Sequence, residues 1–260
     1  MFLQMIRFEW RYYRRQPSFY VTSILFFLLA FFATASDNVQ IGGGGEVWGN
    51  GPFAITRTIT TMLIFSMFLV VNFVSSTALR NHLCLMEELV CTKPVPPLPY
   101  QLGRFVGAYL VVLFVFAMVP LGTLLGSLMP WVDQARFGPT VLSYYVDAYL
   151  IFALPSLFVL SALFYTIASK FKSMQAMYLV AVVVFVLYLV AGSFAQAPEY
   201  RATAALLDPF GLRSFADVAR YWTIVEKNTL SVSFSGVLLQ NRLLWLAVGG
   251  VLLAVFGRLS

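Results

Sequence analysis

Long apolar stretches alternate with short polar connections along the chain. Six stretches carry almost no charge, and each is long enough to form a membrane-spanning helix. They are Phe19–Ala35, Ile59–Leu79, Phe105–Leu128, Val141–Ala168, Gln175–Ala195 and Leu238–Phe256. A transmembrane helix needs about 20 mostly apolar residues to cross the hydrocarbon core of a bilayer. The pattern therefore predicts an all-α polytopic membrane protein with six transmembrane helices, in which residues 1–260 form a single domain.

Residues 1–17 precede the first apolar stretch and have the pattern of an amphipathic helix. Apolar side chains share one face at about 100° per residue: Phe2, Leu3, Ile6, Trp10 and Tyr13. Polar and basic side chains share the other: Gln4, Arg7, Arg11, Arg14 and Arg15. Glu9 is an acid on the apolar side, and Pro17 is expected to end the helix. The two faces predict a cytoplasmic helix in the membrane interface. The helix either only anchors the first span or also contacts a cytoplasmic partner.

Composition narrows the class of protein. Hydrophobic residues make up 60% of the chain and charged residues 11%, against about 25% charged in soluble domains. This excludes an ordinary soluble protein, and the abundance of apolar side chains excludes a disordered one. The net charge of +6 is spread over the polar connections. That distribution indicates membrane topology rather than a nucleic-acid partner.

The basic residues predict which way the helices cross the membrane. One side of the expected topology collects Arg7, Arg11, Arg14, Arg15, Arg80, Lys93, Arg104, Lys170, Lys172 and Arg258. The two shorter connections on the opposite side hold Arg57 and Arg136, and the basic residues of residues 196–237 are offset by acids. Because basic connections stay on the cytoplasmic side, both termini are expected in the cytoplasm.

The sequence offers no motif for metal or nucleotide chemistry. A zinc site needs three or four converging Cys or His ligands, and the chain holds only Cys84, Cys91 and His82. The glycines at 42–45 lack the Lys that completes a phosphate-binding loop. No nucleophile elbow or HExxH motif occurs. We therefore expect no metal site, no cofactor bound by this chain and no covalent chemistry.

Residues 80–104 connect the second and third apolar stretches and are the most informative segment. The apolar side chains of this segment share one helical arc: Leu83, Leu85, Met86, Leu89 and Val90. Glu87 and Glu88 fall on the opposite arc, so a short cytoplasmic helix would display two carboxylates. Prolines then stiffen the chain: Pro94, Pro96, Pro97 and Pro99. The segment is either a solvated surface helix or a docking element for a cytoplasmic partner.

This segment resembles that of the membrane-spanning subunit of type-2 ABC transporters, the exporter-like permeases. The shared pattern is an arginine, an acidic helix, Thr-x-Pro and a Leu-Gly-basic step. Here it reads Arg80, Glu87, Glu88, Thr92, Pro94, Leu102, Gly103 and Arg104. The resemblance extends over the whole chain, with Leu85-Met86 where the family often has Gly-Thr. A bacterial subgroup named for multicopper-enzyme maturation, sometimes fused to a zinc aminopeptidase-like domain, is similar at 7–10, 35–38, 208–211 and 221–223.

The resemblance carries specific expectations. It implies that residues 1–260 are a permease domain in the bacterial cytoplasmic membrane and that residues 80–104 couple it to separate ABC ATPase subunits. ATP and Mg²⁺ would then bind to those subunits, and a second permease copy or a paralogue would complete the translocation pathway. On this basis the chain is a translocation subunit rather than an enzyme.

Residues 196–237 form the long connection before the last span. Asp208 is a suitable N-cap and Pro209 a suitable first helical residue. Four apolar side chains follow at helical spacing: Phe215, Val218, Ala219 and Trp222. The pattern predicts an amphipathic helix on the outer leaflet. The resemblance implies an outer gate that includes Asp208, Pro209, Phe215 and Trp222, and a lid that only packs on the bundle is the other interpretation.

Few polar residues fall inside the apolar stretches. Asp147 is a candidate for the substrate path, although its tyrosine neighbours also fit an interfacial belt. Arg242 lies near the start of the last stretch and is expected to extend its side chain to the interface. Pro120 and Pro155 are expected to kink their helices. Small-residue spacing predicts close helix packing at Gly103-x-x-x-Gly107 and Gly122-x-x-x-Gly126.

Two functions from different classes remain. The first is the membrane subunit of an ATP-driven exporter. The alternative is a non-transporting anchor or regulator that couples an ATPase to a protease or assembly factor on the outer side. An intramembrane enzyme ranks last, because no His, Lys or Glu lies inside an apolar stretch.

Overall fold

The computed structural model describes residues 1–36, 41–84, 97–194 and 197–259. These residues are mainly helical and form no strand beyond one isolated bridge between Gly44 and Val47. Six helical segments are long and apolar enough to cross a membrane: Pro17–Ala35, Pro52–Leu83, Leu98–Ser127, Leu142–Phe171, Met174–Phe194 and Gly236–Val255. The prediction of an all-α polytopic membrane protein with six spans is confirmed.

Three of the six spans are interrupted helices. The second consists of α3 (Pro52–Val70), the π-helix η1 (Val71–Ser75) and α4 (Ser76–Leu83), and the third of α6 (Pro97–Phe116) and α7 (Met118–Ser127). The fourth consists of α8 (Leu142–Ala148), the π-helix η3 (Tyr149–Ala153) and α9 (Leu154–Phe171). The first, fifth and sixth spans are α2 (Pro17–Ala35), α10 (Met174–Phe194) and α14 (Gly236–Leu259).

Two of the interruptions lie where prolines are found. The third span breaks at Ala117, just before Pro120. Proline has no N–H for the carbonyl four residues earlier, and its ring pushes that carbonyl away. Pro155 likewise lies two residues after the end of η3. The expected irregularities at both prolines are therefore present, and η1 adds a third one that has no proline.

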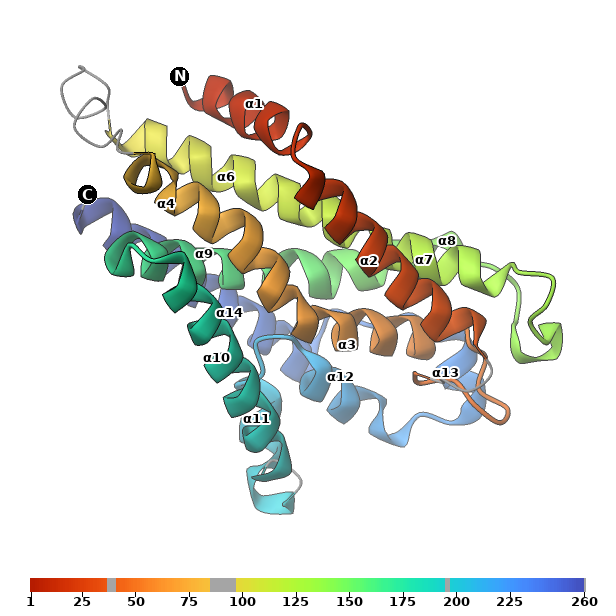
Figure 1. The fold of residues 1–260 in the computed structure, drawn as a ribbon. Coiled ribbons are helices and arrows are strands. Elements are labelled where there is room, and N and C mark those ends of the chain that lie inside the picture. Colours follow the sequence, from red (N-terminus) through yellow and green to blue (C-terminus); the bar gives the residue numbers. More distant parts are fainter. Residues whose placement is uncertain (37–40, 85–96, 195–196, 260) are drawn as a thin grey trace.

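The second, third and fourth spans form the centre of the bundle. The second and fourth are the most buried. Of the residues in their apolar stretches, 72% and 67% are buried inside the protein, against 11% for α10. Side chains such as Leu63, Val112 and Phe152 are fully buried there. Around this centre, α1 (Phe2–Tyr13) packs on α6, α2 on α7 and α14 on α9. Figure 1 shows both termini at the same end of the bundle, which we call the N-terminal end.

Glycines on the third span allow α1 and α2 to approach closely. A Cβ on Gly107 would lie 2.8 Å from the Cβ of Glu9 in α1. A Cβ on Gly122 would lie 2.6 Å from the carbonyl oxygen of Phe27 in α2. Both distances are shorter than side-chain carbons tolerate. The two predicted small-residue motifs are thus confirmed as packing sites, one for the N-terminal helix and one for the first span.

The N-terminal helix agrees with the amphipathic prediction but ends earlier than expected. α1 stops at Tyr13, with Arg14 as its C-cap. Pro17 does not end this helix: it is the first residue of α2, after an extended Gln16. Proline suits a first helical position because the N–H it lacks would have no partner there.

Short helices cap the opposite end of the bundle. They are the 3₁₀ segment η4 (Pro198–Tyr200), α11 (Arg201–Leu206), α12 (Leu212–Val218), η5 (Ala219–Tyr221) and α13 (Ile224–Thr229). The helix expected from Asp208 and Pro209 starts only at Leu212, with Gly211 at φ +82° as its N-cap. The reason is local: the Asp208 carboxylate accepts hydrogen bonds from the backbone N–H groups of Phe210 and Arg213, at 3.0 and 2.6 Å.

Two asparagines connect the loops at this opposite end. The Asn50 side chain donates to the carbonyl of Gly138 at 2.7 Å and accepts from the N–H of Gly138 at 2.8 Å. The Asn228 side chain accepts from the N–H of Trp48 at 2.8 Å and donates to the carbonyl of Glu46 at 3.0 Å. These paired bonds connect three segments that lie far apart in the sequence: residues 46–50, Gly138 and Asn228.

Candidate functional site

A buried carboxylate joins three helices at the N-terminal end of the bundle. Glu9 of α1 is fully enclosed, with 0% of its surface exposed. The guanidinium group of Arg80, on α4, donates to both of its carboxylate oxygens. Nε of Arg104, on α6, lies 3.6 Å from Oε1. We call Glu9, Arg80 and Arg104 the Glu9 cluster.

Further contacts fix both arginines. Arg104 also donates to the backbone carbonyl of Thr77, and the Arg80 guanidinium lies 4.2 Å from the centre of the Tyr12 ring. Two cations around one carboxylate leave a net charge of +1 in the cluster. A carboxylate without these partners would pay a large desolvation cost at this depth. The cluster therefore holds α1, α4 and α6 in one arrangement.

Tyr13 extends this arrangement to the π-helix η1. Its hydroxyl donates to the carbonyl of Phe73 at 2.7 Å and lies 2.6 Å from the Thr77 hydroxyl. Carbonyls in a π-helix lack the regular α-helical partner, and π-helices often mark functional sites. Burial raises the pKa of the Tyr13 hydroxyl to about 12. The hydroxyl therefore stays protonated and remains a donor at any physiological pH.

The Glu9 cluster bears directly on the residues expected to couple to an ATPase. Arg80 and Arg104 are placed together, and their charges point to Glu9 inside the chain. Gly103 packs on Phe2 and Met5 of α1, and Leu102 is exposed. The remaining members lie outside the described residues: Glu87, Glu88, Thr92 and Pro94.

The sequence analysis identified Glu9 as an acid on the apolar face but assigned it no role. The available signal was an acid on the apolar face of an amphipathic helix, together with two arginines at the ends of neighbouring spans. A carboxylate in such a position needs a cation close to it. Sequence spacing does not show which of the many arginines provides it.

A second polar network lies at the opposite end of the bundle, around Arg242 of α14. Arg242 has only 1% of its surface exposed. Its Nε donates to Asn241 Oδ1 at 2.9 Å and its Nη1 to Ser156 Oγ at 2.8 Å. Arg242 does not extend to the interface as expected, because Asn241 on α14 and Ser156 on α9 accept hydrogen bonds from its Nε and Nη1 inside the protein. Its Nη2 is buried and has no hydrogen-bond partner among the described residues.

Asn241 attaches the last span to the connection before it. Its side-chain amide lies within hydrogen-bond distance of three backbone carbonyls, those of Ala205, Leu206 and Asp208, at 2.9, 2.8 and 2.9 Å. The Ser156 hydroxyl adds a bond to the carbonyl of Pro209 at 2.9 Å. Residues 205–209 are thereby tied to both α9 and α14.

The residues expected to form an outer gate lie next to this network. Asp208 and Phe215 are fully buried. The Phe215 ring contacts the rings of Phe152 and Trp222, with centroid distances of 5.8 and 6.0 Å. Pro209 and Trp222 are half-buried. Asp147, the candidate for the substrate path, is half-buried on α8.

Neither cluster has the composition of a metal site. Across the described residues, no three His, Cys, Asp or Glu side chains gather closely enough to hold a metal ion.

In comparisons with known proteins, no family model matches the chain and no curated protein matches it. The functional argument therefore rests on the geometry described above and on the resemblance of the sequence motifs.

Proposed function

We propose that this membrane protein is the membrane-spanning subunit of an ATP-driven exporter of the ABC type, with ATPase subunits supplied as separate chains. The Glu9 cluster is the observation that carries the proposal. It fixes α1 to the ends of the second and third spans, which flank the connection expected to contact the ATPase. A displacement of that connection would therefore move α1 and two spans together.

The interrupted helices support the same mechanism. The second, third and fourth spans each change helix type or break within the bundle, at η1, Ala117 and η3. Such points are where long helices bend. A rigid N-terminal end and a hydrogen-bonded opposite end, joined by spans that bend between them, fit a subunit that rocks between inward and outward states.

The translocation path is proposed to form between two copies or between this chain and a paralogue. Within one chain the centre of the bundle is filled by buried apolar side chains such as Leu63 and Phe152. α10 is the least buried span, and its exposed apolar side chains include Leu179 at 65% and Leu187 at 61%. This surface is available for a second permease.

Co-purification tests the proposal. The tagged chain is extracted in mild detergent from its native membrane, and bound subunits are identified and quantified by mass spectrometry. The proposal predicts an ATP-binding subunit in an amount equal to the chain. Recovery of the chain alone, or with only a peptidase or scaffold protein, would reject the transporter assignment in favour of the anchor alternative.

A further inference from the structure

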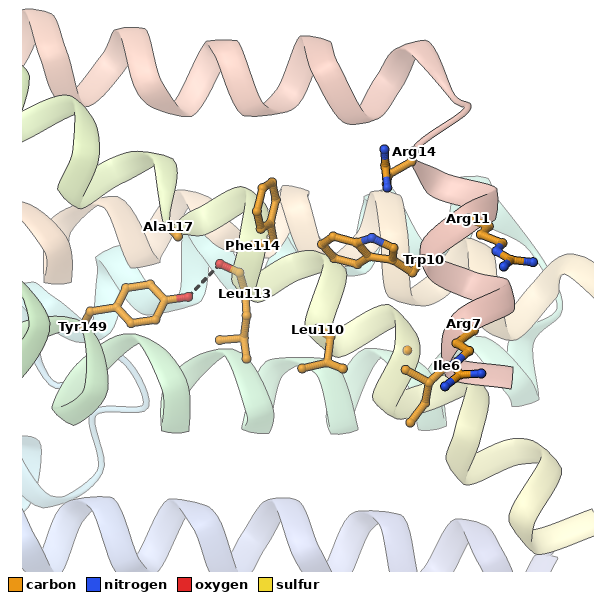
Figure 2. A pocket seen from close by; sticks show the side chains of 11 residues that line it. Ile6, Arg7, Trp10, Arg11, Arg14, Leu110, Leu113, Phe114, Ala117 and Tyr149 are labelled. Carbon is orange, nitrogen blue, oxygen red and sulfur yellow. Dashed lines mark hydrogen bonds between the residues drawn. The ribbon is translucent and has the colours of Figure 1, made fainter. Parts of the chain in front are cut away.

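A groove of about 570 Å³ runs between α1 and α6 at the N-terminal end of the bundle. Its lining comes from α1, from α6 up to the break at Ala117, and from Tyr149 of η3. In Figure 2 the three arginines lie towards one end, and Ala117 and Tyr149 lie at the other. The volume is in the usual range for a ligand site of about 300–1,000 Å³.

One end of the groove is cationic. Arg7, Arg11 and Arg14 line it, and all three are exposed. They share one face of α1 because they follow one another at helical spacing. No acid lines the groove, since Glu9 of the same helix is buried behind it and paired with Arg80. Three positive charges therefore face the groove without an acid there to neutralise them.

The other end of the groove is apolar. Leu110 and Phe114 expose 40% and 44% of their surface. The Tyr149 hydroxyl donates to the carbonyl of Leu113 at 2.6 Å, so its proton is not available to a ligand in the groove. From Gly107 to Ala117 the floor runs about 15 Å along the helix at about 1.5 Å per residue. That length is half of the ~30 Å hydrocarbon core, which is the depth of one leaflet.

We propose that this groove binds one anionic phospholipid from the leaflet at the N-terminal end of the bundle. The phosphate group contacts Arg7, Arg11 and Arg14, and an acyl chain lies along α6 from Gly107 to Ala117. A soluble anion would use the cationic end alone, and a neutral lipid would leave the arginines unmatched. The site does not depend on whether the chain is a transporter.

Native mass spectrometry of the detergent-purified protein tests this site. Phosphatidylglycerol and the zwitterionic phosphatidylethanolamine are titrated separately, and the first bound lipid is quantified. The wild type is expected to bind one phosphatidylglycerol in preference to phosphatidylethanolamine. Changing all three arginines to Gln should weaken phosphatidylglycerol binding on the order of 100-fold, because each basic residue near a lipid headgroup contributes about a fivefold change.

Matched variants separate this site from general attraction to lipid. Arg14→Gln should weaken binding about fivefold, whereas Arg15→Gln, outside the groove, should leave it unchanged. Ala117→Trp keeps every arginine but fills the apolar end, and it should also weaken binding. Equal affinity of the wild type and the triple variant would overturn the site, as would full binding by Ala117→Trp. Thermal melting in the same detergent, with and without phosphatidylglycerol, confirms that each variant is folded and gives a second measure of binding.

Discussion

Glu9 and Arg80 form a buried ion pair between residues that are 71 positions apart in the sequence. The pair fixes the N-terminal helix to the second span. Arg104 brings the third span to the same carboxylate. The N-terminal helix is thus joined at one point to the two spans that flank the expected contact with a cytoplasmic partner.

Removal of this carboxylate tests how much the cluster contributes to stability. Glu9→Gln leaves Arg80 and Arg104 without a counter-charge, and breaking a buried pair in this way typically costs about 3–5 kcal/mol. Chemical unfolding in detergent measures the loss. Glu199→Gln, at an exposed glutamate, serves as the control and should change the free energy of unfolding by less than about 0.5 kcal/mol. Equal stability of the two variants would contradict a structural role for Glu9.

The glycine contact between α2 and α7 gives a second prediction. Gly122→Ala places a Cβ 2.6 Å from the Phe27 carbonyl oxygen, and overpacking of this kind costs about 1–3 kcal/mol. Gly250→Ala, where nothing lies within 4 Å, is the matched control. Because alanine favours helix more than glycine, the control should be neutral or more stable. Thermal melting that ranks the two variants in the opposite order would show that α2 does not pack as described.

The amide of Asn241 provides a third prediction at the opposite end. Asn241→Leu leaves the carbonyls of residues 205, 206 and 208 without their donor, and each unsatisfied buried polar group costs about 1–3 kcal/mol. Gln240→Leu, at the exposed neighbour, is the control. Hydrogen exchange of residues 201–215 should rise strongly in the first variant and stay at the wild-type level in the second. Unchanged exchange in Asn241→Leu would remove this residue from the network.

The capping box of α13 predicts a pH dependence. The N–H and hydroxyl of Thr223 donate to the Glu226 carboxylate at 2.7 and 2.9 Å, and these bonds lower the pKa of that carboxyl. A lowered pKa means that the stabilisation is present at neutral pH and is lost as pH falls through the carboxyl pKa in the folded protein. Hydrogen-exchange protection of residues 223–229, corrected for intrinsic rates, should therefore fall on acidification. Glu226→Ala should show low protection at neutral pH and no such fall; a parallel fall in both would point to another group.

The spans were predictable because each crossing requires a long apolar run, and few other structures use one. The packing motifs Gly103-x-x-x-Gly107 and Gly122-x-x-x-Gly126 were predictable as close contacts, but their partners depend on how the helices are arranged in space. The breaks at Pro120 and Pro155 followed from the missing proline N–H. The π-helix η1 carries no such marker, and its contact with Tyr13 appears only in the fold.

The polar clusters were harder to predict, because a charged residue near the end of a span has two outcomes. It can reach water along its own side chain, or it can find a partner inside the protein. Arg242 finds its partners inside the protein, where it donates hydrogen bonds to Asn241 and Ser156. Glu9 likewise forms an ion pair with Arg80. Apart from the adjacent Asn241, these partners lie 71 positions from Glu9 and 86 positions from Arg242 along the chain. Single-sequence periodicity carries no information about such distant partners.

Coupling to an ATPase is the central claim, and charge reversal at Glu87 and Glu88 tests it most directly. The co-purified ATPase is measured in proteoliposomes with the wild type, with Glu87→Lys plus Glu88→Lys, and with Glu199→Lys as a control for added charge. Because both carboxylates are expected to pair with basic residues of the ATPase, the account predicts that only the double variant loses ATPase binding and stimulation, at an unchanged melting temperature. Wild-type binding and stimulation in the double variant would contradict the account.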